Sequence, residues 1–264
     1  MFNKQMSVKS AEEIELLREN AIIVSKTLAE VAKIIQPGIK TIMLDKIAEE
    51  FILGEGAIPG FKGYRGFPAT LCISINEEVV HGIPGERVLK NGDIVSIDCG
   101  CLKNGYYGDS AYTFTVGEVT AEVKNLLTRT KASLFKALDF AVAGRRVGDI
   151  SGTVQEYVES FGYSVVRELV GHGIGSQLHE KPDIPNYGKR GSGIKLAAGL
   201  TICIEPMINM GVKSVVQEPD KWTIRTADRM PSAHFELTVV VQKEKPDILS
   251  TFRYIEEVLG SSSI

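Results

Sequence analysis

Residues 93–110 read DIVSIDCGCLKNGYYGDS, and this stretch predicts a β-hairpin. An alternating, β-branched run leads to Asn104 and Gly105, and a second β-rich run follows them. An Asn-Gly pair between two such runs is the strongest local hairpin signal, because a two-residue turn of this type needs a positive φ at both positions. The hairpin is therefore the starting point for the fold.

The hairpin also brings two acids together. With this turn, Lys103 pairs with Tyr106 and Gly100 pairs with Asp109. Asp98 lies two residues before Gly100, so it shares a strand face with Gly100 and Asp109. Diagonal neighbours on one face are about 7–8 Å apart, and two acids in buried strands are costly unless a cation neutralises them. The hairpin thus predicts half of a metal site.

The composition is that of an ordinary soluble protein. The chain has 264 residues, of which 44% are hydrophobic and 24% charged, and a net charge of −3. It has no basic excess that would indicate nucleic acid, no apolar run long enough for a membrane span and no secretory signal. Its four cysteines lack metal-binding spacing, so we expect reduced thiols and a cytoplasmic location.

Helix signals occur in two groups along the chain. Ser10 and Glu13 form a capping-box pattern before an apolar-periodic run that ends at Pro37. Three further helices are expected at about 41–53, 121–141 and 150–161, the second of them after Thr120 as N-cap, and a strand is expected near 70–75.

An internal repeat relates the two halves of the chain. Gly38, Leu44, Glu50, Phe51 and Gly56 match similar residues at an offset of 106, and at an offset of 107 the stretch 89–98 (LKNGDIVSID) matches 196–205 (LAAGLTICIE). Each half therefore carries a carboxylate six residues after a glycine. We expect one domain over 1–264, made of two similar halves at about 10–118 and 119–245 with short terminal extensions.

Three further residues have surroundings that favour a metal site. His172 is flanked by glycines, which let backbone approach a ligand closely. Glu205 closes a β-rich run, and Glu236 lies in an alternating run in which His234 shares its face. A core histidine and edge-strand acids are the alternatives for each residue alone, but four such acids with one histidine favour a shared site.

The donor set itself points to a class of metal. Four carboxylates and one imidazole are too many acids for one closed structural zinc site. They suit two divalent ions, such as Co, Mn, Fe(II) or Zn, as in phosphatases, nucleases and aminopeptidases. The glycine-rich segments lack the strand–turn–helix context of a nucleotide-binding motif.

The chain resembles the type I methionine aminopeptidases over nearly its whole length. The similar segments are CISINEEVVHGIP (72–84), VSIDCGCLKNGYYGDSAYTF (95–114), GHGIGSQLHEKPDIPNY (171–187), GLTICIEPM (199–207) and SAHFELTVVV (232–241). The resemblance implies the pita-bread fold, an α+β fold in which a pseudo-twofold antiparallel sheet is flanked by helix pairs. It also implies two divalent metal ions, whose ligands are Asp98, Asp109, His172, Glu205 and Glu236.

The resemblance further implies the other site residues. Glu205 is the general base, His179 stabilises the carbonyl oxygen, and His81 contacts the peptide nitrogen beside the cleaved bond. The methionine pocket is lined by Tyr64, Phe67, Cys72 and Trp222. Four positions are noted as variable or as departures from the family pattern: Phe61, Arg65, Leu178 and His234, the last being Gln in many relatives.

The function expected from the resemblance is removal of the N-terminal initiator methionine from nascent proteins when the second residue is small, by attack of metal-activated water. The expected partner is a peptide or nascent-chain N-terminus, with the ribosome as a further expected contact, no nucleic acid or membrane, and a monomeric chain. The alternatives are an X-Pro aminopeptidase or prolidase and a non-catalytic binding protein on the same fold.

Overall fold

The computed structural model describes residues 6–260 and 264. Its helices are α1 (Ala11–Ala32), α2 (Thr41–Gly54), α3 (Ala121–Leu138), α4 (Val147–Glu159) and α5 (Arg253–Leu259), with a 3₁₀ turn η1 (Tyr64–Gly66). The predicted N-caps are confirmed, since the hydroxyls of Ser10 and Thr120 accept hydrogen bonds from the first turns of α1 and α3. Among the described residues, no helix is both long and apolar enough to cross a membrane.

The predicted hairpin is formed by β4 (Ile94–Lys103) and β5 (Tyr106–Thr115). Asn104 and Gly105 both have positive φ, 53° and 80°, as the turn requires. Gly100 lies opposite Asp109, so the predicted register is confirmed. Asp98 lies opposite Ala111, one diagonal step from Asp109 on the same face.

The other edge of β4 is shared by two strands. β1 (Ile58–Pro59) pairs with its C-terminal end, and β2 (Leu71–Ile75) pairs with its middle and N-terminal part. Cys72 of β2 lies directly opposite Asp98. The strand that carries Asp98 is therefore hydrogen-bonded on both edges, which fixes the direction of its carboxylate.

Three more antiparallel sheets follow. One has the order β15 (Asp247–Ile248), β14 (Leu237–Val240), β9 (Thr201–Ile204), β7 (Gly171–Gly173) and β8 (Glu180–Ile184). A second contains β13 (Ser232–His234), β10 (Met207–Asn209) and β6 (Ser164–Val165), and a third contains β11 (Val215–Gln217), β12 (Ile224–Thr226) and β3 (Glu78–Val80).

The hairpin joins the second half of the chain through the outer edge of β5. Ala111 forms a β-bridge with Glu236, and the hydroxyl of Ser110 donates to the Glu236 carbonyl oxygen at 2.7 Å. The sequence predicted one alternating strand through 234–238, but the structure divides it between β13 and β14. The division occurs because Glu236 pairs with β5 while Phe235 is buried in the core.

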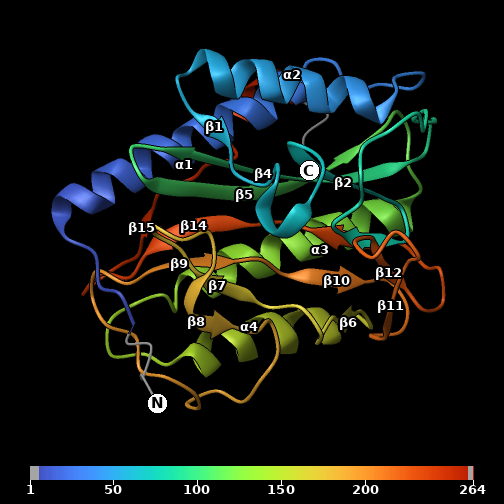
Figure 1. Cartoon of the computed structure of the whole chain (residues 1–264). Coiled ribbons are helices and arrows are strands. Elements are labelled where there is room, and N and C mark those ends of the chain that lie inside the picture. Colours follow the sequence, from blue (N-terminus) through green and yellow to red (C-terminus); the bar gives the residue numbers. More distant parts are fainter. Residues whose placement is uncertain (1–5, 261–263) are drawn as a thin grey trace.

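The helices cover one side of this strand assembly. In Figure 1, α1 and α3 run behind the strands, while α2 and α4 lie along the upper and lower margins. α1 packs directly on β4 and β5. The approach is close at Gly108, where an added Cβ would lie 2.5 Å from the carbonyl carbon of Asn20. Helices on one side leave the opposite side of the strands free to form a site.

We propose that residues 10–118 and 119–245 are equivalent halves of one domain. The first half contributes the α1–α2 pair and the β4–β5 hairpin, and the second contributes the α3–α4 pair and the β9–β14 strand pair. The helices of each pair pack against each other. This arrangement supports the sequence repeat, because matching segments form matching elements.

The N-terminal segment is tied to the loop before β8. Val8 forms a β-bridge with Leu200, and the buried ammonium of Lys9 lies 2.6 Å from a carboxylate oxygen of Glu180. The other Glu180 oxygen accepts the backbone N–H of Gln177 at 3.2 Å. The Glu180 carboxylate therefore joins the two ends of the short loop that carries His179, and the ion pair with Lys9 fixes this carboxylate.

Removing this cation tests its contribution to stability. We expect Lys9→Met to lower the free energy of unfolding by about 3 kcal/mol, because Glu180 would keep a buried charge without its partner. The melting temperature should then fall by roughly 6–12 °C. Calorimetry should show a much smaller change for Lys33→Met, whose ion pair with Glu30 is largely exposed. Equal melting temperatures for the two variants would contradict the expectation.

Candidate metal centre and substrate cavity

One cavity of about 190 Å³ contains every site residue expected from the sequence. Its wall includes acidic, imidazole, aromatic and thiol side chains from both halves of the chain. The expected residues among them are Tyr64, Phe67, Cys72, His81, Asp98, Asp109, His172, His179, Glu205, Trp222 and Glu236. Side chains up to 172 residues apart in sequence are thus brought to one place.

Polar donors gather at one end of this cavity. β4 and β5 supply Asp98 and Asp109, β7 supplies His172, and Glu205 and Glu236 lie directly beside β9 and β14. One carboxylate oxygen each of Asp98, Asp109 and Glu236 is buried and has no hydrogen-bond partner within residues 6–260 and 264. Unpaired buried carboxylate oxygens are costly, so this end of the cavity is suited to a cation.

The distances between the lone-pair atoms also indicate that this end of the cavity is suited to a cation. Nε2 of His172 lies 3.8 Å from Oδ2 of Asp109 and 3.6 Å from Oε1 of Glu205. These separations are too long for hydrogen bonds. Nδ1 of His172 donates to the carbonyl oxygen of Gly173 at 2.9 Å, because that oxygen can only accept. In the neutral ring Nε2 therefore has a free lone pair facing two carboxylates.

Burial controls the charges of the four acids. It raises the pKa of Asp98 to about 7. Burial raises the pKa values of Asp109, Glu205 and Glu236 well above their ordinary values, and the neighbouring carboxylates raise them further. Four acids in so small a volume cannot all ionise without positive charge beside them.

Burial has the opposite effect on the histidines. It lowers the pKa of His172 to about 4 and, with the nearby His172, Arg65 and His81, lowers the pKa of His179 to about 3. The pKa of His81 is also lowered by burial. These imidazoles are therefore neutral near pH 7, which is the form that binds metals and that offers one N–H and one lone pair.

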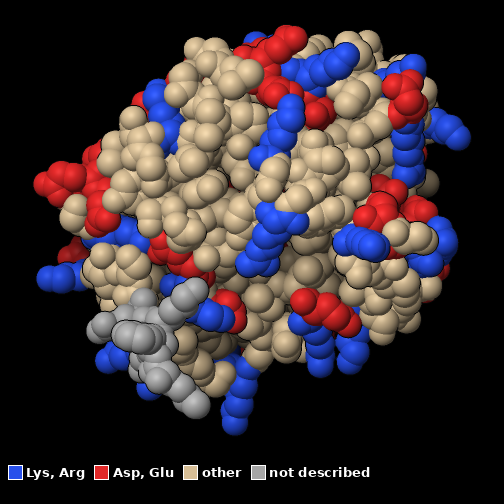
Figure 2. Space-filling view, viewed as in Figure 1, with Lys and Arg blue, Asp and Glu red and all other residues tan. Residues whose placement is uncertain are grey.

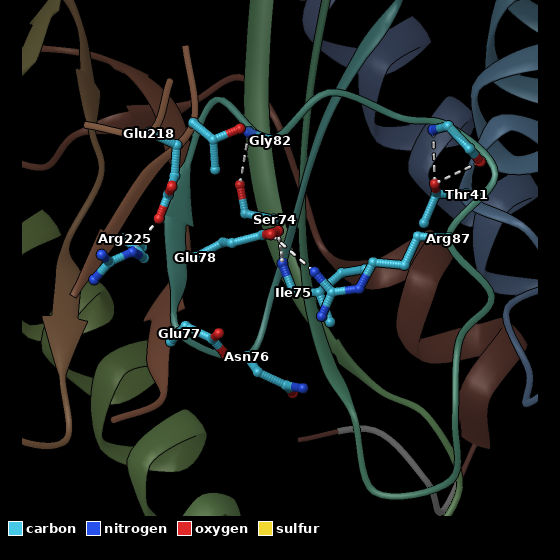
Figure 3. Close-up of polar contacts among 12 residues, drawn as sticks. Thr41, Ser74, Ile75, Asn76, Glu77, Glu78, Gly82, Arg87, Glu218 and Arg225 are labelled. Carbon is cyan, nitrogen blue, oxygen red and sulfur yellow. Dashed lines mark hydrogen bonds and ion pairs between the residues drawn. The ribbon is translucent and has the colours of Figure 1, made fainter. Parts of the chain in front are cut away.

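His81 lies in a loop that several polar contacts hold in place. Its φ is +61°, which is unusual for a residue with a side chain. The next residue, Gly82, donates its N–H to the Ser74 hydroxyl at 3.1 Å, and an added Cβ there would lie 2.1 Å from the Ile73 carbonyl oxygen. Figure 3 shows the hydrogen bond between Gly82 and Ser74. The backbone strain at His81 fits a functional position.

The same loop is anchored at both ends. The carboxylate of Glu78 accepts the backbone N–H of Ile75 and a guanidinium N–H of Arg87, each at 2.8 Å (Figure 3). The hydroxyl of Thr41 exchanges hydrogen bonds with the backbone of Gly85. These contacts fix the path of the chain on either side of His81.

His179 lies between the donor cluster and the pocket wall. Its ring centroid is 4.3 Å from that of His172 and 5.4 Å from that of Tyr64. The Tyr64 hydroxyl is 2.9 Å from Nδ1 of His179. His179 is therefore placed beside any group that occupies the cavity.

The remaining wall is apolar and aromatic. Phe67 and Trp222 meet edge to face at a centroid distance of 5.2 Å, and Cys72 and Leu178 belong to the same buried cluster. Phe61 closes the cavity against Gly100, where an added Cβ would lie 2.5 Å from the Phe61 ring. Such a wall suits an unbranched apolar side chain.

Two residues at the donor end were not assigned from the sequence. Ligand atoms of Cys203, Asp109, His172 and Glu236 all lie within 4.8 Å of one another. Cys203 stands two residues before Glu205, and this strand spacing was the available signal. His234 was noted as a departure, and its Nε2 lies 3.8 Å from Oε2 of Glu205.

Side chains of both charges are mixed on the face that Figure 2 shows. Lysines and arginines there alternate with acids and do not form a continuous basic patch. The central part of this face is mostly uncharged.

Comparisons with known proteins identify the family of this chain. The model of metallopeptidase family M24 matches residues 15–243. The methionine aminopeptidase of Clostridium acetobutylicum is 50% identical over 244 residues, which are 92% of this chain and 98% of that protein. The crystal structure of the Thermotoga maritima methionine aminopeptidase has a TM-score of 0.92 at 42% identity, covering 94% of this chain and all of that one.

The X-Pro hydrolases share the fold at greater distance. The Pyrococcus furiosus prolidase is 22% identical with a TM-score of 0.75, and the matched region covers only 65% of that chain. This likeness shows a common fold alone.

The expected pita-bread α+β fold is confirmed by the methionine aminopeptidase structure and the family match. By sequence and by structure, the chain belongs to metallopeptidase family M24, among its methionine aminopeptidases.

Proposed function

We propose that this protein is a methionine aminopeptidase that removes the N-terminal methionine of a peptide chain when the second residue is small. The observation that carries the proposal is that Nε2 of His172 lies 3.8 Å from a carboxylate oxygen of Asp109 and 3.6 Å from one of Glu205, at one end of a cavity whose other wall is apolar. The donor group suits divalent metal, and the cavity suits one unbranched side chain.

The proposed metal ligands are Asp98, Asp109, His172, Glu205 and Glu236. They fit divalent ions because Asp98, Asp109 and Glu236 each have a buried oxygen without a partner, and the free lone pair of His172 faces Asp109 and Glu205. We propose two ions, drawn from Co, Mn, Fe(II) or Zn, since four carboxylates exceed what one ion needs. When bound, such ions lower the pKa of a bound water and polarise a carbonyl group.

Three side chains are proposed to act on the substrate. Glu205 accepts the proton of the attacking water and passes it to the leaving amine. His179 donates a hydrogen bond to the oxygen of the first peptide carbonyl, where negative charge develops. His81 contacts the nitrogen of the second residue and places the peptide. All three are held at the cavity by the contacts described above.

The proposed methionine pocket consists of Tyr64, Phe67, Cys72 and Trp222. Aromatic edges and a thiol make favourable contacts with a thioether. Leu178 adds an apolar wall at the position where relatives often have an aromatic residue. We also propose that the protein acts as a monomer in the cytoplasm, on the N-termini of nascent chains, and that it contacts the ribosome there.

Peptide cleavage tests the function. We expect release of methionine from Met-Gly-Met-Met but not from Met-Phe-Met-Met or Ala-Pro-Met, and only after a divalent ion is added to metal-free protein. Asp109→Ala should reduce the rate at least 10³-fold, because it removes a proposed ligand of both ions. Asp139→Ala, a change at an exposed acid, should leave the rate unchanged.

Each other outcome of this assay has a defined meaning. Preferential cleavage of Ala-Pro-Met would replace the proposal with the X-Pro alternative. A protein that binds metal yet cleaves none of the peptides would favour a non-catalytic binding protein on the same fold.

The raised pKa of Asp98 predicts how the metal-free protein responds to pH. The pKa of Asp98 is about 7 in the folded protein and about 3.9 in the unfolded chain, so the folded state binds this proton more tightly. The resulting stabilisation is complete below pH 4 and is lost as the pH rises through 7. Thermal scans in chelator should show a melting temperature that falls from pH 5 to pH 8. Asp98→Asn should flatten the slope.

Bound metal should reverse this dependence. Divalent ions bind ionised carboxylates, so their stabilising effect grows as pH rises. A melting temperature of the metal-free protein that stays constant or rises from pH 5 to pH 8 would contradict the proposed burial of these acids.

A further inference from the structure

Tyr64 makes a contact that its proposed place in the methionine pocket does not require. Its hydroxyl oxygen lies 2.9 Å from Nδ1 of His179, 115 residues away in the sequence. The two rings are tilted by 33° with their centroids 5.4 Å apart. This contact joins the pocket wall directly to a residue proposed to act on the substrate carbonyl.

Both partners lie in segments that local contacts hold in place. In the turn η1, Tyr64 donates its N–H to the Phe61 carbonyl oxygen, and its own carbonyl oxygen accepts the N–H of Phe67, each at 2.9 Å. His179 belongs to the loop closed by the hydrogen bond from the Gln177 N–H to the Glu180 carboxylate, which also pairs with Lys9. The hydrogen bond between the side chains therefore connects two fixed segments.

The direction of this hydrogen bond decides which nitrogen of His179 carries hydrogen. A neutral imidazole has one N–H and one lone-pair nitrogen. If Nδ1 accepts from the tyrosine hydroxyl, the hydrogen is on Nε2; if Nδ1 donates, Nε2 has only a lone pair. Only the first form lets Nε2 donate a hydrogen bond to a carbonyl oxygen.

We propose that Tyr64 is a positioning residue: its hydroxyl donates to Nδ1 of His179 and thereby keeps the hydrogen on Nε2, where it can be donated to the substrate carbonyl. This inference rests on the role of His179 in the proposed function. It gives Tyr64 two separable parts, a ring that lines the methionine pocket and a hydroxyl that selects the form of His179.

Tyr64→Phe separates these parts, because it removes the hydroxyl and keeps the ring. We expect kcat for Met-Gly-Met-Met to fall about five- to twentyfold, which corresponds to the loss of one hydrogen bond, while KM stays within twofold. Tyr107→Phe is the matched control, since Tyr107 packs against the same apolar cluster. That variant should keep both kinetic constants.

Nitrogen NMR reads the hydrogen position independently of activity. The chain has only four histidines, so the ring nitrogens of ¹⁵N-histidine-labelled, Zn-loaded protein can be assigned by single substitutions. For His179 we expect the chemical shift of a protonated Nε2 and an unprotonated Nδ1. In Tyr64→Phe both shifts should move towards the average of the two forms, and in Tyr107→Phe they should not move.

The other outcomes separate the two hypotheses. A wild-type His179 protonated on Nδ1, or a Tyr64→Phe variant with unchanged kcat and unchanged shifts, would overturn the role of Tyr64. If His179→Ala keeps full activity, the role of His179 in the proposed function is wrong, and the assignment of Tyr64 is overturned with it. If His179→Ala loses activity but Tyr64→Phe keeps the wild-type kcat and chemical shifts, only the positioning role of Tyr64 is overturned, and the role of His179 stands.

Discussion

Nε2 of His172 has a free lone pair in the interior of this protein, and it lies 3.8 Å from Oδ2 of Asp109 and 3.6 Å from Oε1 of Glu205. No hydrogen can bridge such distances, and buried carboxylates repel one another strongly. The acids on the surrounding strands can therefore be ionised together only when a positive charge lies at this point. The other features of the site follow from this constraint.

The fold meets the constraint by distributing the acids over well-paired backbone. Asp98 and Asp109 come from a long hairpin whose two strands are hydrogen-bonded along their full length. Glu236 is fixed to that hairpin through the bridge with Ala111, and Glu205 follows a strand of the neighbouring sheet. Helices cover the other side of the sheets and leave the donor side open to the cavity (Figure 1). Rigid strands thus hold groups that would otherwise move apart.

Local sequence signals predicted the parts of this arrangement that depend on local geometry. The turn at Asn104 and Gly105 set the hairpin register, and the register alone placed Asp98 and Asp109 on one face. The capping residues gave the starts of α1 and α3 correctly. The surroundings of each acid and of His172 suggested the donor set, but the roles of these residues and the pocket came from resemblance to a family, because residues distant in sequence carry no spacing that predicts their meeting.

Features that depend on long-range packing were not predicted. The alternating run through Glu236 gave no sign that a bridge to β5 would divide it into two strands. The approach of Cys203 to the acids, the ion pair of Lys9 with Glu180 and the hydrogen bond of Tyr64 with His179 each join segments far apart in the chain. These contacts exist only once the sheets have assembled.

The number of divalent ions that the metal-free protein binds tests the central constraint most directly. Isothermal titration calorimetry with Mn(II) and Co(II) at neutral pH should compare the wild-type chain with Asp109→Asn. We expect two ions per wild-type chain, and at most one weakly bound ion in the variant. Equal binding by both proteins, or no binding by the wild type, would contradict a metal centre built on these carboxylates.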